Sequence, residues 1–533
     1  MKRFGVMLDC SRNAVMKPEK VKEFASILKS FGYNMLQLYT EDTYEVENEP
    51  YFGYMRGRYT VEELADIVTY CNSIGMEVIP CIQTLAHLNQ IFRWDLYKAI
   101  NDTTDILLVE EERTYVLIEN MFKTLRKAFT SEYVHIGMDE AHMIGLGKYL
   151  DRHGYQNRFD ILYKHLLKVR DIAEKYGFKP IMWSDMFFRL ANKGVYFSAN
   201  PKLDAEVISK IPERIGLVYW DYYHHEEEYY THMMQEHKQV GETWFAGGAW
   251  TWAGFASGNK KTMDTMVPAM FAAKKTDIDN IFLTMWGDDG KECSFYSVLP
   301  SLFAVRKYYD GETDIEKIKT EFKEITGENY DAFFVLDAPN MVGGSSGTPE
   351  NPCKHMLYND PFTGTFDSTV KEGVTKQYAE YAKQLAVYAK NSKYNYLFES
   401  MSVLCEVLAI KYDLGSRTRK AYLEKNKVEI SSLIRDYEQA EILLEKFHKA
   451  FQKLWFIENK PHGFDVQDLR LGGLMQRLKS SRLRLLAYVN GEVDCIPELN
   501  EKLLDFYGDG DIFNMDKTPH TNVWPLLASV NKI

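Results

Sequence analysis

The sequence predicts an α/β fold in which a (β/α)8 barrel, or TIM barrel, is followed by a mostly α-helical C-terminal domain. Two observations favour this class. The first part of the chain alternates eight short strand-type segments with amphipathic helix-type segments, which is the pattern of a closed parallel barrel. After about Tyr309 no further strand-type segment is evident. A length of 533 residues also exceeds what one hydrophobic core usually serves, so a second domain is expected.

The eight predicted strands are rich in β-branched and aromatic residues, as buried strands are. They run from Phe4 to Asp9, Asn34 to Tyr39, Glu77 to Ile82, Tyr133 to Gly137, Pro180 to Ser184, Gly216 to Trp220, Trp244 to Ala249 and Ile281 to Trp286. An open, doubly wound sheet is the structural alternative. The chain lacks the Gly-rich phosphate-binding loop that would favour such a sheet.

The intervening helices have recognisable start and stop signals. The helix that begins at Pro18 has proline in its first turn and ends before Gly32. Thr60-Val-Glu-Glu63 is a capping box for a helix that Gly75 stops. The segment from Leu162 to Tyr176 has the same form and ends before Gly177.

The predicted domains are a catalytic-type barrel over residues 1–309 and a helical domain over 310–533. Residues 336–365 are rich in Gly, Pro, Ser and Asn and predict a long surface connection. The chain is helix-forming from Asp367 to about Val489, with Glu429 to Glu458 as the longest amphipathic stretch. We interpret the Tyr and Leu stripes of this part as core.

Composition limits the classes of function. The net charge of −12 argues against binding to nucleic acid or to an anionic membrane surface, and it suits a neutral substrate. No apolar stretch is long enough to span a bilayer. The aromatic content of 14% suits stacking on sugars, although Tyr-rich packing would also explain it. The seven cysteines form no Cys-x-x-Cys pair, and the start of the chain does not have the pattern of a signal peptide. Buried thiols and a cytoplasmic location are therefore expected.

The most informative segment is Tyr133-Val-His-Ile-Gly-Met-Asp-Glu140, in which a strand ends in two adjacent carboxylates. The carboxyl ends of the strands are where parallel barrels keep their chemistry. Two carboxylates in a partly buried site are costly to ionise together, so the pKa of one should rise, which would make it a general acid. The alternative is an Asp-Glu pair that caps a helix.

The run His135-Ile-Gly-Met-Asp139-Glu140 closely resembles the His-x-Gly-x-Asp-Glu signature of glycoside hydrolase family 20, the β-N-acetylhexosaminidases. The resemblance extends over the barrel as an ordered set of strand ends, and the helical tail is similar to one bacterial branch, the exo-β-N-acetylglucosaminidases. It implies substrate-assisted catalysis, in which the 2-acetamido oxygen attacks the anomeric carbon and forms an oxazoline. Asp139 would hold the acetamide N–H and Glu140 would be the general acid and base. No cofactor and no metal are implied.

The same resemblance implies sugar-binding roles for several polar residues. Arg12 would hold the hydroxyls at C3 and C4, although an Asp9–Arg12 ion pair would also explain it. His87 could orient a carboxylate or a hydroxyl, or be a satisfied core histidine. We interpret His135 as an orienter of the acidic pair rather than a metal ligand, because no His-x-His or His-Glu-x-x-His spacing is present.

Five tryptophans fall at the ends of predicted strands five to eight, namely Trp183, Trp220, Trp250, Trp252 and Trp286. The family wraps the acetamide methyl group in tryptophans and stacks one beneath the pyranose ring, which implies Trp183, Trp220 and Trp286 most directly. Trp250 and Trp252 share a face if the chain is extended, although one of them could pack beneath the loop.

Two further assignments follow the family less closely. Asp288 is in position to accept from hydroxyls at C4 and C6, and its alternative is a turn residue between glycines. Family members hold the acetamide carbonyl with a tyrosine, usually on strand seven, where this chain has tryptophan. The nearest match is Tyr219-Trp-Asp-Tyr222-Tyr223 on strand six, and Tyr222 is our choice.

The expected function is a retaining exo-β-N-acetylhexosaminidase that acts on oligosaccharides with terminal β-linked N-acetylglucosamine, with N-acetylgalactosamine as a second candidate sugar. One rival is the substrate-assisted β-N-acetylglucosaminidase family with an Asp-Asp pair, which Glu140 and the His-x-Gly-x lead-in disfavour. Another is a non-catalytic glycan-binding protein on the same barrel, which the intact acidic pair disfavours. Helical tails in such barrels can close a neighbour's active site, so a homo-oligomer stays open as an alternative to a monomer.

Overall fold

The structure is a computed structural model that describes residues 2–191, 194–197, 208, 211–506 and 508. It contains two compact units. The barrel unit comprises Met1–Ala249, Thr262–Trp286 and Leu302–Asp314, and the helical unit comprises Trp250–Lys261, Gly287–Ser301 and Ile315–Ile533. The segments that follow the seventh and eighth strands are thus parts of the helical unit, although the chain returns to the barrel unit after each of them.

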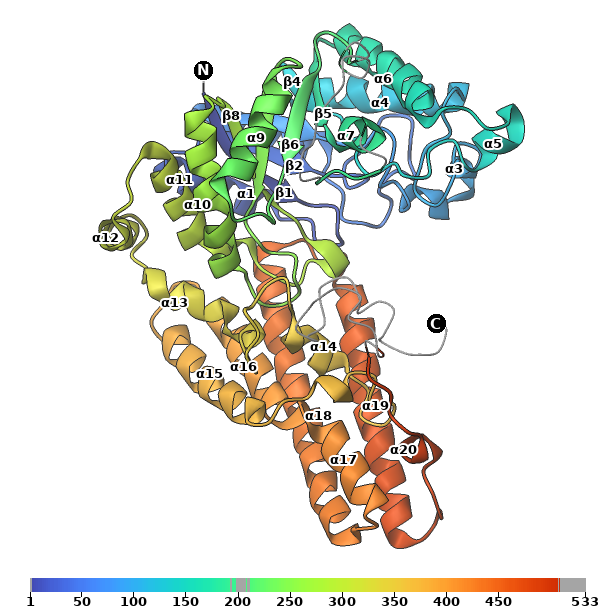
Figure 1. The fold of residues 1–533 in the computed structure, drawn as a ribbon, viewed down its shortest axis with the longest axis vertical. Helices are drawn as coiled ribbons and strands as arrows, with labels where there is room; N and C mark the ends of the chain where they lie inside the picture. The colour runs from blue at the N-terminus through green and yellow to red at the C-terminus, as the bar shows by residue number, and fades with distance from the viewer. Residues whose placement is uncertain (1, 192–193, 198–207, 209–210, 507, 509–533) are drawn as a thin grey trace. The chain divides into compact units, whose positions relative to one another are not determined.

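The barrel unit holds a closed barrel of eight parallel strands in sequence order, which confirms the predicted fold class (Figure 1). The strands are β1 (Arg3–Asp9), β2 (Met35–Tyr39), β3 (Glu77–Cys81), β4 (Tyr133–His135), β5 (Lys179–Trp183), β6 (Gly216–Trp220), β7 (Thr243–Gly248) and β8 (Asn280–Met285). Their residues are almost all buried, as expected where helices cover a parallel sheet. The predicted strands are all present, and no end is displaced by more than two residues.

The helix at Pro18 and the helix after Thr60 begin and end as the sequence predicts, whereas the predicted segment from Leu162 to Tyr176 belongs to a helix that begins at Arg158. Pro18 opens α1 (Pro18–Ser30), and Thr60 and Glu63 form the capping box of α2 (Val61–Ser73). The other segments are η1 (Ile91–Arg93), α3 (Asp95–Lys98), α4 (Glu112–Ala128), α5 (Lys148–His153), α6 (Arg158–Lys175), α7 (Asp185–Ala191), α9 (Glu227–Lys238), α10 (Asn259–Lys275) and α11 (Leu299–Asp310). Both α10 and α11 begin in the helical unit and continue into the barrel unit.

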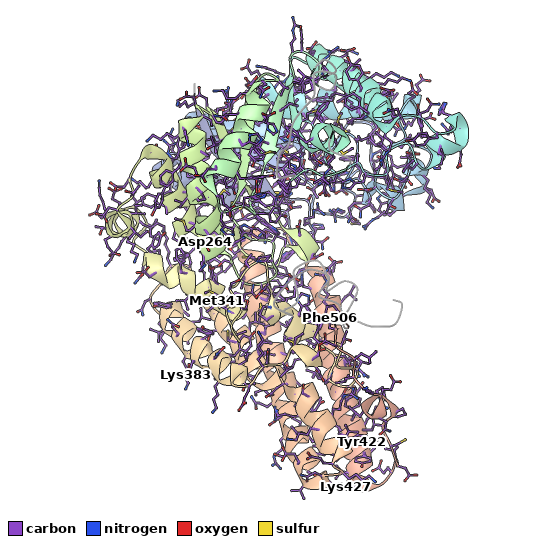
Figure 2. The ribbon with its side chains drawn as sticks, viewed as in Figure 1. Asp264, Met341, Lys383, Tyr422, Lys427 and Phe506 are labelled. Atoms are coloured by element: carbon purple, nitrogen blue, oxygen red, sulfur yellow. The ribbon has the colours of Figure 1, made fainter. Side chains whose placement is uncertain are left out.

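Over its described residues the helical unit has helices and no strand, with isolated bridge residues at Trp250, Gly258, Glu350 and Asn459. Its segments are η2 (Asp288–Gly290), η3 (Phe295–Val298), α12 (Ile315–Thr326), α13 (Tyr330–Phe334), η4 (Val335–Asn340), α14 (Pro352–Tyr358), η5 (Asp367–Thr369), α15 (Val374–Ala389), α16 (Asn395–Lys411), α17 (Leu414–Leu423), α18 (Lys427–Glu458), α19 (Phe464–Asn490) and α20 (Pro497–Asn500). Tyr422 and Lys427 mark the tight turn between α17 and α18 in Figure 2. None of the described helices is long and apolar enough to cross a bilayer.

The longest amphipathic stretch is α18, whose 32 residues include the predicted segment. Its buried stripe confirms that these side chains form core, and it packs against α16, α17 and α19. The stripe contains Ile430, Leu433, Tyr437, Leu444, Phe447 and Phe451.

The prediction of a surface connection over residues 336–365 is wrong. Most of this segment is buried, and it contains η4 and α14. Its Gly, Pro and Asn residues correctly indicate a backbone with many turns, but apolar side chains between them, such as Leu336 and Leu357, are fully enclosed. Turn-forming residues predict turns in the backbone, but they do not predict whether other parts of the protein pack over the segment and bury it.

The seven cysteines are free thiols. Six are buried, as expected, and Cys495 is exposed. The expectation of buried thiols is therefore wrong for that one residue, which follows α19 in a loop.

Candidate active site

The acidic pair follows β4 in a tight turn at the carboxyl end of the barrel. Gly137 and Met138 have φ of 72° and 69°, and Glu140 has φ of 50°. This backbone ends the strand two residues before the predicted Gly137. The Asp139 side chain is 13% exposed, whereas that of Glu140 is 45% exposed. One carboxylate is thus enclosed and the other is open to a ligand.

Asp139 is held by two side chains from the end of β3. Gln83 Nε2 donates to Asp139 Oδ1 at 2.8 Å, and His87 Nε2 lies 3.2 Å from Asp139 Oδ2 and 3.8 Å from Glu140 Oε2. Burial alone would raise the pKa of Asp139, but His87 and Gln83 outweigh it and lower that pKa. Burial likewise disfavours a charged His87, yet Asp139 and Glu41 raise its pKa to about 10. Asp139 is an anion beside a cation.

These contacts determine the direction in which the pKa of Asp139 shifts. The sequence predicts a raised pKa for one of the two carboxylates, and for Asp139 the shift has the opposite sign. A carboxyl with a raised pKa does lie beside them, but it is Asp185, which the sequence analysis missed. Burial, and then repulsion from Asp139, raise the pKa of Asp185 to about 7.

Asp185 is the first residue of α7, directly after β5, and it is fully buried. Its Oδ2 accepts a hydrogen bond from the Glu140 N–H at 3.2 Å and lies 3.2 Å from Arg189 Nε. It therefore fixes the backbone that carries Glu140. The available signal was an acid immediately after a predicted strand end, in Trp183-Ser-Asp185, where only the tryptophan drew attention.

We expect Asp185 to make stability depend on pH. The pKa of about 7 in the folded protein lies above the unfolded value of roughly 4, so the folded protein keeps a proton that the unfolded chain releases. Its contribution to the free energy of unfolding is therefore greatest below about pH 4 and is lost as the pH rises to about 7. Asp185→Asn should flatten this decline in melting temperatures measured between these pH values. The exposed Asp171→Asn should keep the slope. Parallel curves for the starting protein and Asp185→Asn would contradict the assignment.

Arg12 lies beside two carboxylates. Its Nη2 lies 3.2 Å from Glu41 Oε1, and its Nε lies 3.9 Å from Asp9 Oδ2. Glu41, which the sequence analysis did not single out, is the closer partner. The Arg12 side chain is nevertheless 32% exposed, so ion pairing does not enclose it.

His135 is a buried, neutral support. Its Nδ1 accepts from the Gly137 N–H at 3.1 Å, and its ring centre lies 4.4 Å from that of Trp183. Burial lowers the pKa of His135 to about 3. The ring reaches the acidic pair only through the backbone turn. Within the described ranges, no group of three or more His, Cys, Asp or Glu side chains could hold a metal ion.

Three of the predicted tryptophans make aromatic contacts in the barrel unit. Trp183 and Trp286 have ring centres 6.0 Å apart, and the Trp286 ring meets Tyr39 edge-on at 4.9 Å. Trp220 stacks on Tyr222, with centres 5.6 Å apart and planes at 24°. The predicted Trp183, Trp220 and Trp286 thus all lie at the carboxyl ends of barrel strands, next to other candidate residues.

The three tyrosines near the end of β6 have different surroundings. Tyr219 donates to Asp221 at 2.8 Å, and its ring contacts His237 of the covering helix α9. Tyr223 is 42% exposed. Tyr222 is buried, and its ring stacks on that of the candidate Trp220.

Three predicted residues belong to the helical unit rather than to the barrel unit, namely Trp250, Trp252 and Asp288. The rings of Trp250 and Trp252 stack at 4.1 Å with planes at 20°, and both side chains are buried. Asp288 is partly exposed and opens the short turn η2 after Gly287, as its alternative assignment as a turn residue describes.

Comparison with known proteins identifies the family. The model of the glycosyl hydrolase family 20 catalytic domain matches residues 3–240, and that of the Glycoside Hydrolase 20C C-terminal domain matches residues 331–515. Beta-hexosaminidase 3 of Arabidopsis thaliana is 24% identical over 36% of this chain and 38% of its own length. Hexosaminidase D of Homo sapiens is 21% identical over 40% of this chain and 43% of its own length. The chain therefore spans well under half the length of these relatives.

Solved structures to which this chain is similar include a GH20 exo β-N-acetylglucosaminidase from Vibrio harveyi in complex with N-acetylglucosamine. It is 15% identical, with a TM-score of 0.46 over 61% of this chain and 58% of that one. The family assignment rests on the two matched domain models, which describe the barrel and the helical region separately. This chain belongs to glycoside hydrolase family 20.

Proposed function

We propose that this chain is a retaining exo-β-N-acetylhexosaminidase. It would release terminal β-linked N-acetylglucosamine from glycans, with N-acetylgalactosamine as a second sugar. The observation on which this depends is the turn after β4, where an enclosed anionic Asp139 is followed by an accessible Glu140. Family membership and the names of the curated relatives, which are hexosaminidases, support the reaction class.

The placement of the pair argues for assistance by the substrate. Two-carboxylate retaining glycosidases place their groups about 5–5.5 Å apart on opposite faces of the sugar. Asp139 and Glu140 are consecutive residues on one turn and approach the sugar from the same side. Neither is therefore well placed to attack C1 from the face opposite to the one on which the other acts as general acid. The acetamido oxygen of the substrate supplies the missing nucleophile.

In the proposed first step, this oxygen bonds to C1 as the bond from C1 to the leaving oxygen breaks. Glu140 gives its proton to the leaving oxygen, and anionic Asp139 accepts from the acetamide N–H and stabilises the positive charge of the oxazolinium ring. Water then attacks C1 while Glu140 takes its proton, and the acetamide is restored. Two inversions at C1 leave the β configuration unchanged.

The remaining residues hold the terminal sugar in this scheme. The exposed part of Arg12 donates to hydroxyls at C3 and C4. Trp183 and Trp286 pack against the ring and the acetamide methyl group, with Trp220 completing the box. Each chemical step uses protein side chains and the substrate itself.

Turnover of a nitrophenyl N-acetyl-β-glucosaminide, measured beside the galacto epimer, tests the proposal. We expect release of nitrophenol from the gluco substrate, and the ratio of the two kcat/KM values gives the sugar preference. Binding of N-acetylglucosamine without turnover of either glycoside would instead indicate a glycan-binding protein and overturn the proposal.

We expect Tyr222→Phe to lower kcat by about 10-fold or more, because the hydroxyl that aligns the attacking carbonyl is lost. Tyr223→Phe is the matched control and should retain kcat, since Tyr223 lies at the surface. Steady-state rates on the nitrophenyl substrate check both variants. A silent Tyr222→Phe together with an impaired Tyr223→Phe would transfer the role to the neighbouring tyrosine.

A further inference from the structure

Gln83 is a buried amide with three hydrogen bonds in the candidate site. Its Nε2 donates to Asp139 Oδ1 at 2.8 Å and to Tyr39 Oη at 3.0 Å, and its Oε1 accepts from the Met138 N–H at 3.2 Å. The side chain is fully enclosed by the barrel. Gln83 thus donates both amide hydrogens, one to Asp139 in the acidic turn and one to Tyr39.

These contacts allow only one orientation of the amide. If the amide were rotated by 180°, its oxygen would face the Asp139 carboxylate and its NH2 group would face the Met138 N–H. Two favourable contacts would become two repulsions, so the backbone of residue 138 fixes which end of Gln83 meets Asp139.

Tyr39 anchors the other side of Gln83. The Tyr39 hydroxyl donates to Glu41 Oε1 at 3.0 Å, which directs its proton away from Gln83 and leaves a lone pair for the amide. Glu41 is itself held by Arg12 at 3.2 Å. The chain of donors runs from Gln83 through Tyr39 to a buried carboxylate, and every link has one allowed direction.

Gly137, the glycine of the family signature, leaves the space that the Gln83 side chain occupies. A Cβ atom at Gly137 would lie 2.1 Å from Gln83 Oε1 and 2.5 Å from its Cδ. Any larger residue would therefore displace Gln83. The close approach of the β4 turn to Gln83 requires glycine at this position, in addition to the φ of 72°.

We propose that Gln83 is a positioning residue for the reaction, which aims the Asp139 carboxylate at the acetamide N–H of the substrate. The inference rests on the proposed function. Asp139 acts most strongly when charge develops in the transition state, so misdirecting it should lower kcat more than it raises KM. A hydrogen bond to a charged group is a strong one, and its loss should lower kcat by about 10- to 100-fold.

Gln83→Met tests this, because methionine has a similar volume and no donor. We expect kcat on the nitrophenyl N-acetyl-β-glucosaminide to fall by about 10- to 100-fold with KM changed by less than about threefold. Gln37→Met is the matched control. Gln37 is an equally buried glutamine of the barrel, on β2, whose amide has no hydrogen-bond partner among the described residues, and its variant should keep kcat.

Two further measurements separate positioning from a general structural effect. The Gln83→Met effect should disappear in an Asp139→Asn background, because the group to be aimed is already disabled. Gln83→Glu should show a kcat optimum displaced to lower pH, since only the protonated carboxyl of this variant can donate to Asp139. That profile also provides a test if Gln83→Met does not fold.

Unchanged kcat in Gln83→Met, or effects of the two substitutions that multiply fully in the double variant, would overturn the inference. So would a pH profile of Gln83→Glu that matches the starting protein. In each of these cases, turnover by the unmodified protein leaves the proposed function in place. Absence of turnover by the unmodified protein overturns the function instead.

Discussion

Glu140→Gln should nearly abolish cleavage of an N-acetylglucosamine disaccharide and affect a nitrophenyl glycoside far less. The substitution keeps the shape of the side chain and the Glu140 N–H bond to Asp185, but it removes the transferable proton. A sugar alkoxide is a poor leaving group and needs that proton, whereas nitrophenolate leaves almost without it. General acid catalysis contributes about 10²–10⁴ in rate, so the disaccharide should lose kcat/KM by that factor.

The comparison should use kcat/KM, because this constant reports the steps through the first irreversible one and is independent of later oxazoline hydrolysis. The nitrophenyl substrate should lose about 10-fold or less in the same constant. Glu111→Gln makes the same change of charge on the outside of the barrel unit, where Glu111 pairs with Arg152, and should leave both constants unchanged. Equal losses on both substrates would remove Glu140 from the role of general acid.

The parts of the site that the sequence predicts are those that lie at strand ends. A barrel brings the carboxyl ends of its strands together, so Arg12, His87, Asp139, Trp183 and Trp286 could be assigned to one end before any coordinates were known. The helices could also be predicted from the sequence, because proline, capping boxes and glycine stops are local signals.

The sign of the Asp139 shift could not be predicted in the same way. It depends on His87 and Gln83, which lie more than fifty residues earlier and reach the carboxylate through a loop whose path the sequence does not specify. Adjacent carboxylates suggest repulsion, but the dominant neighbours are a cation and an amide donor. Asp185 illustrates the reverse case, since its raised pKa arises from enclosure by residues that are not local in the chain.

Interior polar contacts were missed for a related reason. Gln83 lies within the same strand end as His87, but a glutamine there has no distinctive pattern, and its role becomes visible only when the Met138 N–H and Tyr39 hydroxyl are placed around it. Likewise, the segments that contain Trp252 and Asp288 follow barrel strands in the sequence, whereas their contacts group them with the helical unit.

A β-glucoside with a hydroxyl at C2 should bind more weakly than the N-acetylglucosaminide and should hardly react. It presents its ring to Trp183 and Trp286 and its hydroxyls to Arg12. It lacks both the attacking carbonyl and the methyl group that fills the aromatic box. It also has no N–H group that could donate a hydrogen bond to Asp139. The anion that Gln83 and His87 hold in place then has no charge to stabilise.

Magnitudes decide which kinetic constant changes more. Loss of an oriented internal nucleophile forfeits a large part of about 7–11 kcal/mol. An unfilled methyl pocket costs only about 1–3 kcal/mol. The fall in kcat should therefore far exceed the rise in KM when nitrophenyl β-glucoside and its 2-acetamido analogue are compared under the same conditions. Turnover of the glucoside at a comparable kcat would require a protein carboxylate as nucleophile, and the oxazoline mechanism and the role of Asp139 would then both be wrong.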